Sequence, residues 1–150
     1  MDLKEEDILG DGIGRHWYYR SKAAALGRAV AGIKPRRLLD VGAGSGFFSR
    51  HLLAQTPAES ALCVDIGYLV DRDDSVAGKP VLYRRDCGQT DCDLVLMMDV
   101  LEHVDDDRGL VRHYAAKVPA GAHFLVTVPA FQFLWSGHDV FLDHKRRYRL

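Results

Sequence analysis

Apolar residues along this chain fall into short unbroken runs, and the segments between the runs carry apolar residues at helical spacing. The unbroken runs predict buried strands at 38–41, 61–64, 81–83, 94–98 and 124–128. The helical spacing predicts helices at 17–31, 45–54 and 105–118. Strands that are apolar throughout, rather than at alternate positions, are typical of a parallel sheet covered on both faces. The pattern therefore predicts an α/β fold with a doubly wound, mostly parallel sheet.

Acidic residues follow the predicted strands at the points where the strands end. Asp40, Asp65, Asp86 and Asp99 stand at or near the carboxyl ends of the first four strands. In an open doubly wound sheet, ligands bind at this edge. Chance would scatter such carboxylates along the chain, so we predict that they border a ligand cleft.

A glycine-rich loop, DVGAGSG at 40–46, connects the first predicted strand to the following helix. Glycine lets the backbone turn sharply and approach a ligand without a Cβ atom in the way. The loop differs from the dinucleotide fingerprint G-x-G-x-x-G/A, because Phe47 stands where the third glycine or alanine belongs. This spacing disfavours an NAD-dependent oxidoreductase, which stays open as the less favoured alternative.

The loop resembles the first motif, D/E-x-G-x-G-x-G, of class I S-adenosylmethionine-dependent methyltransferases, which share a Rossmann-like fold. The segment DLVLMMDVLEHVDDD at 93–107 is similar to the fourth-strand segment of that superfamily, with its frequent LEH. The segments 16–22 and 128–150 resemble a bacterial branch that acts on small molecules. The resemblance implies strand order 3-2-1-4-5, S-adenosyl-L-methionine as cofactor and methyl transfer to an unidentified small-molecule acceptor. A non-catalytic S-adenosylmethionine-binding module is the other alternative.

The resemblance also implies roles at the cofactor site. Asp40 would orient the methionyl amino group, and Asp65 would accept hydrogen bonds from the two ribose hydroxyls. The adenine would meet Asp86 and the backbone N–H of Cys87, and the methionyl end would lie beside Met98 and Asp99. The full set of implied cofactor-binding residues is Asp40, Gly42, Ala43, Gly44, Gly46, Asp65, Ile66, Asp86, Cys87, Met98 and Asp99.

Two histidines after the fifth predicted strand, His138 and His144, are the candidate catalytic residues. The fold usually places acceptor-binding groups there, and a general base is needed where the acceptor must lose a proton. For His103 the sharper alternative is a divalent metal site, because Asp99, Glu102 and His103 match the E-x-x-E-H arrangement of some quinone O-methyltransferases. An interior histidine that anchors its loop is the simpler interpretation, so we predict no metal site.

Composition limits the classes of protein that fit. The chain, 1–150, has the size of one domain, with 47% apolar and 27% charged residues, and we expect one S-adenosylmethionine-binding domain. A net charge of −1 gives no case for a nucleic-acid partner, and the longest apolar stretch is too short to span a membrane. Three cysteines without a C-x-x-C pair and a polar N-terminus favour a cytoplasmic location.

One feature of the resembling family has no counterpart in the predicted strands, namely the antiparallel hairpin that closes the sheet after the fifth strand. Five strands fill the chain up to Leu150, so we expect a C-terminally truncated domain that lacks this hairpin. The fifth strand would then be an exposed apolar edge, which invites pairing with another chain. We therefore expect either a homodimer through this edge or a poorly ordered tail after about Gly137.

Overall fold

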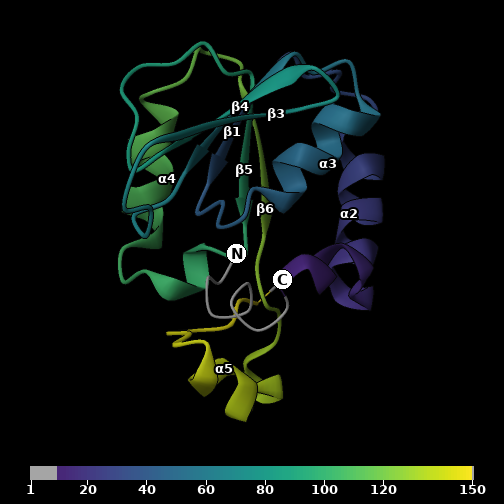
Figure 1. Cartoon of the computed structure of the whole chain (residues 1–150). Helices are drawn as coiled ribbons and strands as arrows, with labels where there is room; N and C mark the ends of the chain where they lie inside the picture. The colour runs from purple at the N-terminus through teal and green to yellow at the C-terminus, as the bar shows by residue number, and fades with distance from the viewer. Residues whose placement is uncertain (1–9, 150) are drawn as a thin grey trace.

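A six-stranded sheet forms the centre of the computed structural model, which describes residues 10–149 (Figure 1). The strands are β1 (Arg37–Val41), β2 (Ser60–Val64), β3 (Arg72–Val76), β4 (Lys79–Arg84), β5 (Leu94–Met98) and β6 (His123–Thr127). Their order across the sheet is β3-β4-β2-β1-β5-β6, and every pair is parallel except β3 with β4. The predicted strands correspond to β1, β2, β4, β5 and β6, so the predicted order 3-2-1-4-5 is confirmed within a larger sheet.

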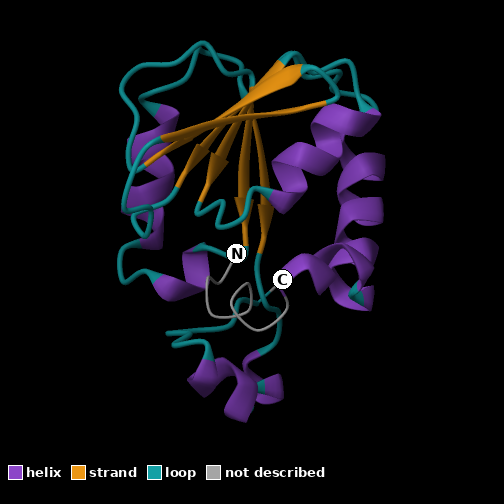
Figure 2. Cartoon of the chain, viewed as in Figure 1, coloured by secondary structure: helices purple, strands orange, loops and turns teal. Residues whose placement is uncertain are grey.

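Helices cover both faces of the sheet (Figure 2). On one face lie α2 (Trp17–Val30) and α3 (Phe47–Gln55), and on the other lies α4 (Asp107–Ala115). The three predicted helices are confirmed, although α4 ends before the predicted limit at 118. The shorter helical elements are η1 (Gly10–Arg15), η2 (Leu101–His103), η3 (Gln132–Leu134) and α5 (Gly137–Phe141).

The hydrophobic core has two layers, because neighbouring residues of one strand point to opposite faces of the sheet. Leu38 of β1 packs among buried side chains of α2 and α3, including Leu26 and Leu52. The next residue, Leu39, packs on the other face with Tyr114 of α4. All residues of β5 are buried. The apolar runs of β1 and β5 therefore correspond to strands covered on both faces, as predicted, whereas β6 at the edge of the sheet is only partly buried.

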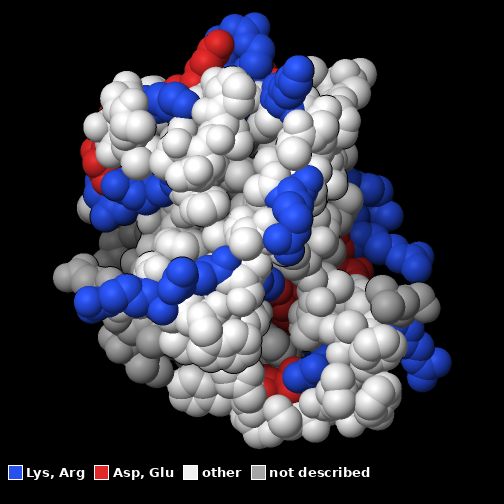
Figure 3. Space-filling view, turned by 90° about the vertical axis from the view of Figure 1, so that its right-hand side faces the viewer, with Lys and Arg blue, Asp and Glu red and all other residues white. Residues whose placement is uncertain are grey.

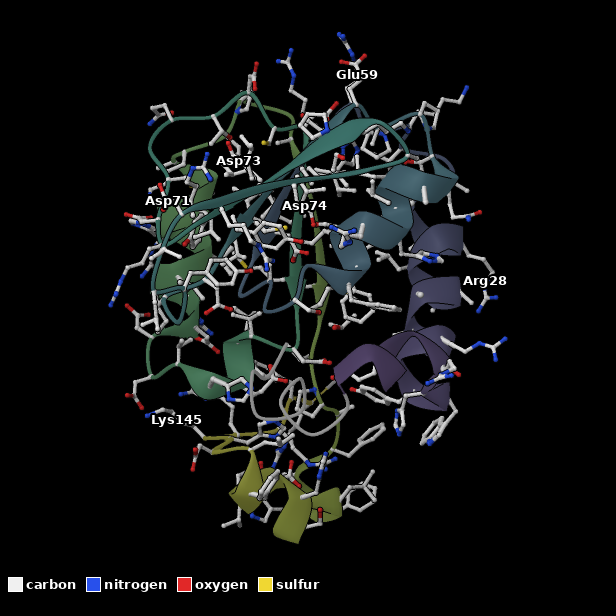
Figure 4. All side chains as sticks on the ribbon, viewed as in Figure 1. Arg28, Glu59, Asp71, Asp73, Asp74 and Lys145 are labelled. Carbon is white, nitrogen blue, oxygen red and sulfur yellow. The ribbon has the colours of Figure 1, made fainter. Side chains whose placement is uncertain are left out.

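The strand β3 is a finding that the apolar pattern did not predict. It pairs with β4 through a tight turn at 77–78, where both residues have positive φ. Its sequence, RDDSV, is mostly exposed, and Oδ1 of Asp73 lies 2.7 Å from Nη2 of Arg84 in β4. Figure 4 labels Asp71, Asp73 and Asp74 along this edge. A charged edge strand discourages pairing with other chains, and it offers no apolar run by which the sequence pattern identifies it.

The chain beyond β6 forms a small lobe below the carboxyl edge of the sheet (Figure 1). A capping box begins α5. The Tyr148 N–H donates to the Pro129 carbonyl (2.8 Å), and the Lys145 N–H donates to the Glu102 carbonyl (2.8 Å). These contacts hold the lobe against the body of the domain, whereas the order of the tail after about Gly137 stays a prediction. The other alternative, pairing of the β6 edge with a second copy, stays a prediction.

The glycine loop between β1 and α3 passes through left-handed backbone at Gly42, Gly44 and Gly46, with φ of 65°, 53° and 74°. A Cβ atom on Gly46 would stand 2.8 Å from the hydroxyl oxygen of Tyr83. That hydroxyl donates to the Ser45 carbonyl (3.1 Å) and so holds the loop against β4. Gly46 is therefore required both by its backbone conformation and by the close approach of a core side chain.

We predict that Gly46→Ala destabilises the chain more than Gly78→Ala does. Both glycines are left-handed, with φ of 74° and 75°, so both substitutions carry a backbone strain of about 1–2 kcal/mol. A Cβ atom on Gly78 would meet nothing within 4 Å, whereas one on Gly46 would press on Tyr83 and add about 1–3 kcal/mol. Urea unfolding of the wild type and both variants measures the difference. Equal losses for the two variants would show that the Tyr83 contact relaxes without cost.

Candidate functional site

Two hollows open at the carboxyl edge of the sheet, against the C-terminal lobe. The loop-side hollow, about 700 Å³, is bordered by Gly42 of the glycine loop and by Asp65 and Ile66 after β2. The helix-side hollow, about 480 Å³, is bordered by α2 and by the end of β6. The residues that line both hollows are Asp99, His103, Leu142 and His144. Figure 3 views the side of the molecule that carries α2 and shows a recess above the lower lobe with acidic side chains inside it.

Asp65 fixes the glycine loop to the turn after β2. Its Oδ2 atom accepts a hydrogen bond from the Gly44 N–H (3.0 Å), and its Oδ1 atom accepts one from the Gly67 N–H (2.8 Å). Because each carboxylate oxygen has two lone pairs, each oxygen of Asp65 keeps an acceptor position beyond these bonds. Asp65 therefore combines support of the loop with acceptors available to a ligand in the loop-side hollow that it borders.

Asp40 lies beneath the glycine loop, with only 2% of its surface exposed. Its Oδ2 atom accepts a hydrogen bond from the Ser49 hydroxyl of α3 (2.7 Å). Burial raises the pKa of Asp40 to about 6, and the Ser49 hydrogen bond opposes that rise. The contact joins β1 to the first turn of α3. The implied role of Asp40 at a methionyl amino group stays a prediction.

Asp99 follows β5 and has a positive φ of 55°. Such a conformation is uncommon for aspartate, and strained residues cluster at functional sites. Its Oδ2 atom accepts hydrogen bonds from the Tyr18 hydroxyl (3.0 Å) and from Nζ of Lys22, and Oδ1 accepts one from the Thr127 hydroxyl (3.0 Å). Residues of α2 and β6 thereby hold one carboxylate beside a lysine where the two hollows meet.

The remaining implied residues of the loop and of β5 differ in exposure. Ala43, Gly44 and Gly46 are buried parts of the glycine loop. Met98 is 2% exposed and packs in the core, and its implied place at the methionyl end stays a prediction. Ile66 is 82% exposed at the border of the loop-side hollow, where an apolar ligand surface would cover it.

Asp86 and Cys87 follow β4 and are not among the residues that border the loop-side hollow. Oδ1 of the exposed Asp86 accepts hydrogen bonds from Nζ of Lys117 (2.9 Å) and from the Cys87 N–H (2.8 Å). These two bonds hold the pKa of Asp86 below its usual range. In the structure the Asp86 carboxylate and the Cys87 N–H bind each other. Their implied contacts with an adenine ring stay predictions.

The C-terminal lobe brings both candidate catalytic histidines to the hollows. His138 borders the helix-side hollow, and His144 borders both. Nδ1 of His144 lies 3.0 Å from Oδ1 of the buried Asp139, which Arg147 holds through two hydrogen bonds of 2.8 Å. Arg147 keeps the pKa of Asp139 well below its usual range, so a charged carboxylate orients the imidazole ring of His144.

Glu102 of η2 is buried with 0% of its surface exposed, and it borders the helix-side hollow. Neither of its carboxylate oxygens has a hydrogen-bond partner among the described residues. Burial raises the pKa of Glu102 to about 7, and the charge of Asp99 acts in the same direction. One ligand atom each of Glu102, His103 and His144 lie within 4.8 Å of one another. Three groups of metal-binding type thus meet where the sequence led us to predict no metal site.

The contacts of three polar residues of the site were not predicted from the sequence. Tyr18 and Lys22 reach Asp99 from α2, and Arg147 reaches Asp139 within the C-terminal lobe. The available signal for Tyr18 and Lys22 was their spacing of four residues, which places them on one helical face. For Arg147 no local pattern distinguishes it from the neighbouring basic residues Lys145 and Arg146.

Comparison with known proteins gives a consistent result. The model of a family described as a methyltransferase domain matches residues 15–148. No curated protein matches the sequence. Among solved structures, an O-methyltransferase family protein from Burkholderia thailandensis is similar with a TM-score of 0.70 and 14% identity, over 96% of this chain and 50% of that one. The chain thus spans about half the length of that protein.

Two further solved structures share the fold. The N-methyltransferase NodS from Bradyrhizobium japonicum, solved with S-adenosyl-L-homocysteine, has a TM-score of 0.60 and 13% identity, over 81% of this chain and 65% of that one. A putative O-methyltransferase from Nostoc punctiforme has a TM-score of 0.57 and 20% identity, over 76% of this chain and 39% of that one. At these identities the likeness establishes the arrangement of strands and helices.

We predict that Asp40 makes the stability of the chain depend on pH. Its pKa of about 6 in the folded state lies above the usual 3.8, so between these values the folded state binds more protons than the unfolded state. The free energy of unfolding then falls as pH rises through this interval. Asp40→Asn removes this titration. From about pH 4 to about pH 7, its stability relative to the wild type should rise by up to about 3 kcal/mol in denaturant unfolding. Parallel curves for the two proteins would contradict the prediction.

Proposed function

Because the chain belongs to the methyltransferase-domain family, we propose that it transfers a methyl group from S-adenosyl-L-methionine to a small-molecule acceptor. The observation that carries the proposal is the meeting of two hollows at Asp99, His103 and His144. Methyl transfer needs donor and acceptor in adjoining spaces, with the methyl carbon at their junction. We infer that the donor lies in the loop-side hollow and the acceptor in the helix-side hollow, within one cofactor-binding domain over 1–150.

The charges around the loop-side hollow suit this donor. Its ribose hydroxyls would take the acceptor positions that Asp65 keeps, beside the glycine loop. Its amino-acid end carries an ammonium, which would be attracted by Asp99 where the two hollows meet, and a carboxylate, which would face Lys22 on the helix side of Asp99. The sulfonium is a cation, and a carboxylate-rich edge attracts it while repelling a pyrophosphate. The family resemblance alone supports contacts of the donor with Asp40, Asp86, Cys87 and Met98.

The helix-side hollow fits a small acceptor with an apolar body. Its volume of about 480 Å³ lies within the range of small-molecule sites. Aromatic side chains of α2 and α3, among them Trp17 and Phe48, form part of its wall. Its cationic groups are already paired, Lys22 with Asp99 and Arg147 with Asp139, so the hollow offers no unbalanced positive charge to a polyanion.

None of the described helices is both long and apolar enough to cross a membrane.

The proposed step is a displacement in line at the methyl carbon. A lone pair of the acceptor forms the new bond to carbon, and the carbon–sulfur bond breaks with its electron pair returning to sulfur. The sulfonium becomes the neutral thioether of S-adenosyl-L-homocysteine. Where the acceptor is a hydroxyl, its proton passes to a base, and His138 and His144 are the candidates because both border the acceptor hollow.

We predict that S-adenosyl-L-homocysteine raises the melting temperature of the chain and that NAD does not. Asp65→Ala should weaken S-adenosyl-L-homocysteine binding about tenfold or more, since a hydrogen bond to a charged group contributes about 1.5–3 kcal/mol. The matched control is Asp71→Ala, because Asp71 is exposed and borders neither hollow. Calorimetric titration measures the affinities. An unchanged affinity of Asp65→Ala would assign the ribose to another residue, and a response to NAD alone would favour the oxidoreductase.

We predict that His138→Ala lowers kcat by about 100-fold or more if the acceptor is a hydroxyl, while the affinity for S-adenosyl-L-homocysteine stays unchanged. Activity is measured with methyl-labelled S-adenosyl-L-methionine over a panel of small hydroxylated, amino and aromatic compounds. His113→Ala is the control, because His113 lies exposed on α4 and borders neither hollow. Cofactor binding without methyl transfer to any acceptor would favour the non-catalytic binding module.

A further inference from the structure

Glu102 is the least expected polar side chain in the structure. It is 0% exposed, and neither carboxylate oxygen has a hydrogen-bond partner among the described residues. An unpaired carboxylate in such a place is costly, and buried acidic groups are ordinarily paired, hydrogen-bonded or bound to a metal. Two histidines from different parts of the described chain lie beside it: His103 follows it in η2, and His144 comes from the C-terminal lobe.

The meeting of these three side chains is fixed by backbone contacts. The Lys145 N–H donates to the Glu102 carbonyl (2.8 Å), so the residue after His144 is tied to η2. The rings of His103 and His144 lie edge to face with their centroids 4.8 Å apart. One ligand atom of each residue lies within 4.8 Å of the ligand atoms of the other two. Donor atoms bound at about 2.0–2.2 Å to a common ion lie at most about 4.4 Å apart. Small side-chain rotations would therefore bring the three ligand atoms from within 4.8 Å of one another to coordinating distances.

The ring of His144 is held as metal-bound histidines are held. Its Nδ1 atom lies 3.0 Å from Asp139, and this contact leaves Nε2 as the ligand atom. Asp139 is 0% exposed and is fixed by Arg147 and by the Ser136 N–H (2.8 Å). A carboxylate on the far nitrogen of a histidine orients the ring and makes it a stronger ligand.

We propose that Glu102, His103 and His144 form a binding site for one divalent transition-metal ion such as Zn²⁺, Mn²⁺ or Co²⁺. Two imidazoles with one carboxylate suit these ions better than Mg²⁺ or Ca²⁺, which prefer oxygen ligands throughout. The set differs from the one that the E-x-x-E-H resemblance offers, because Asp99 is engaged by Lys22 and His144 takes its place. Asp139 is a positioning residue that acts through His144, and a metal-bound His144 leaves His138 as the candidate base.

The position of this site gives the metal ion a role in binding the acceptor, and that role rests on the proposed function. His103 and His144 line both hollows, and Glu102 lines the acceptor hollow. A metal ion there stands at the border between donor and acceptor spaces. With three protein ligands it keeps open positions, at which an oxygen atom of the acceptor would bind.

The test is a titration of the chelator-treated full chain with Co²⁺, followed by visible absorption, and with Zn²⁺, followed by calorimetry. The wild type should bind one ion per chain. Glu102→Gln keeps the volume of the side chain and should weaken binding more than 100-fold, as should His144→Ala. Asp139→Asn should weaken binding by about 10–100-fold, the range for a residue that supports a ligand. His123→Ala, at an exposed histidine of β6, should leave the affinity unchanged.

Circular dichroism and the shift in melting temperature with S-adenosyl-L-homocysteine show whether each variant is folded, and they do not depend on the metal. Wild-type chain that binds neither ion at millimolar concentration would overturn the proposal. So would variants at Glu102 and His144 that are folded and bind Co²⁺ as tightly as the wild type, or an equal loss in His123→Ala. Failure of the metal site with intact S-adenosyl-L-homocysteine binding would leave the proposed function standing.

Discussion

Burial of the central sheet on both faces confines polar chemistry to the ends of its strands. Every residue of β5 is buried, and Asp99, which directly follows the strand, belongs to neither of the two core layers. The same holds for β2, where Asp65 follows the last buried residue of the strand. Because β1, β2, β4, β5 and β6 are parallel, their carboxyl ends share one edge, and everything assigned to the site lies at or near it. The glycine loop, the two hollows and the C-terminal lobe are arranged around this edge.

The depth of each carboxylate relative to that edge decides what it does. Asp40 lies inside the core boundary, where burial favours its protonated form and Ser49 is its partner. Asp65 lies at the boundary and binds two backbone N–H groups while facing the loop-side hollow. Asp99 lies at the junction of the hollows and is balanced by Lys22. Asp86 lies outside, where its exposed carboxylate pairs with the largely covered side chain of Lys117. One residue type thus provides packing, loop support and ligand acceptors.

The parts of the fold that the sequence predicts are those in which local pattern and burial agree. Unbroken apolar runs identified β1, β2, β4, β5 and β6. The closely spaced glycines at 42, 44 and 46 identified the loop between β1 and α3. The strand β3 escaped because a charged edge strand has no apolar run, and α5 escaped because it is short and mostly exposed. At the site, position after a strand identified Asp65 and Asp99. Met98 is the last residue of β5 itself, and its side chain packs in the core. Contacts between distant segments, such as Lys22 with Asp99, have no local signal.

The C-terminal lobe shows why such contacts matter most for the chemistry. A single buried carboxylate, Asp139, accepts hydrogen bonds from Ser136 and Arg147 and lies against His144. It therefore begins α5, ties the end of the lobe to its start and sets the orientation of a ring that borders both hollows. Arg147 keeps this carboxylate charged, so the arrangement does not depend on a proton in the physiological range. The lobe side of both hollows thus depends on one ion pair within a short segment, whereas their opposite side is built by α2, the glycine loop and the ends of the strands. Changes in the lobe can alter the first side while the glycine loop and Asp65 stay in place.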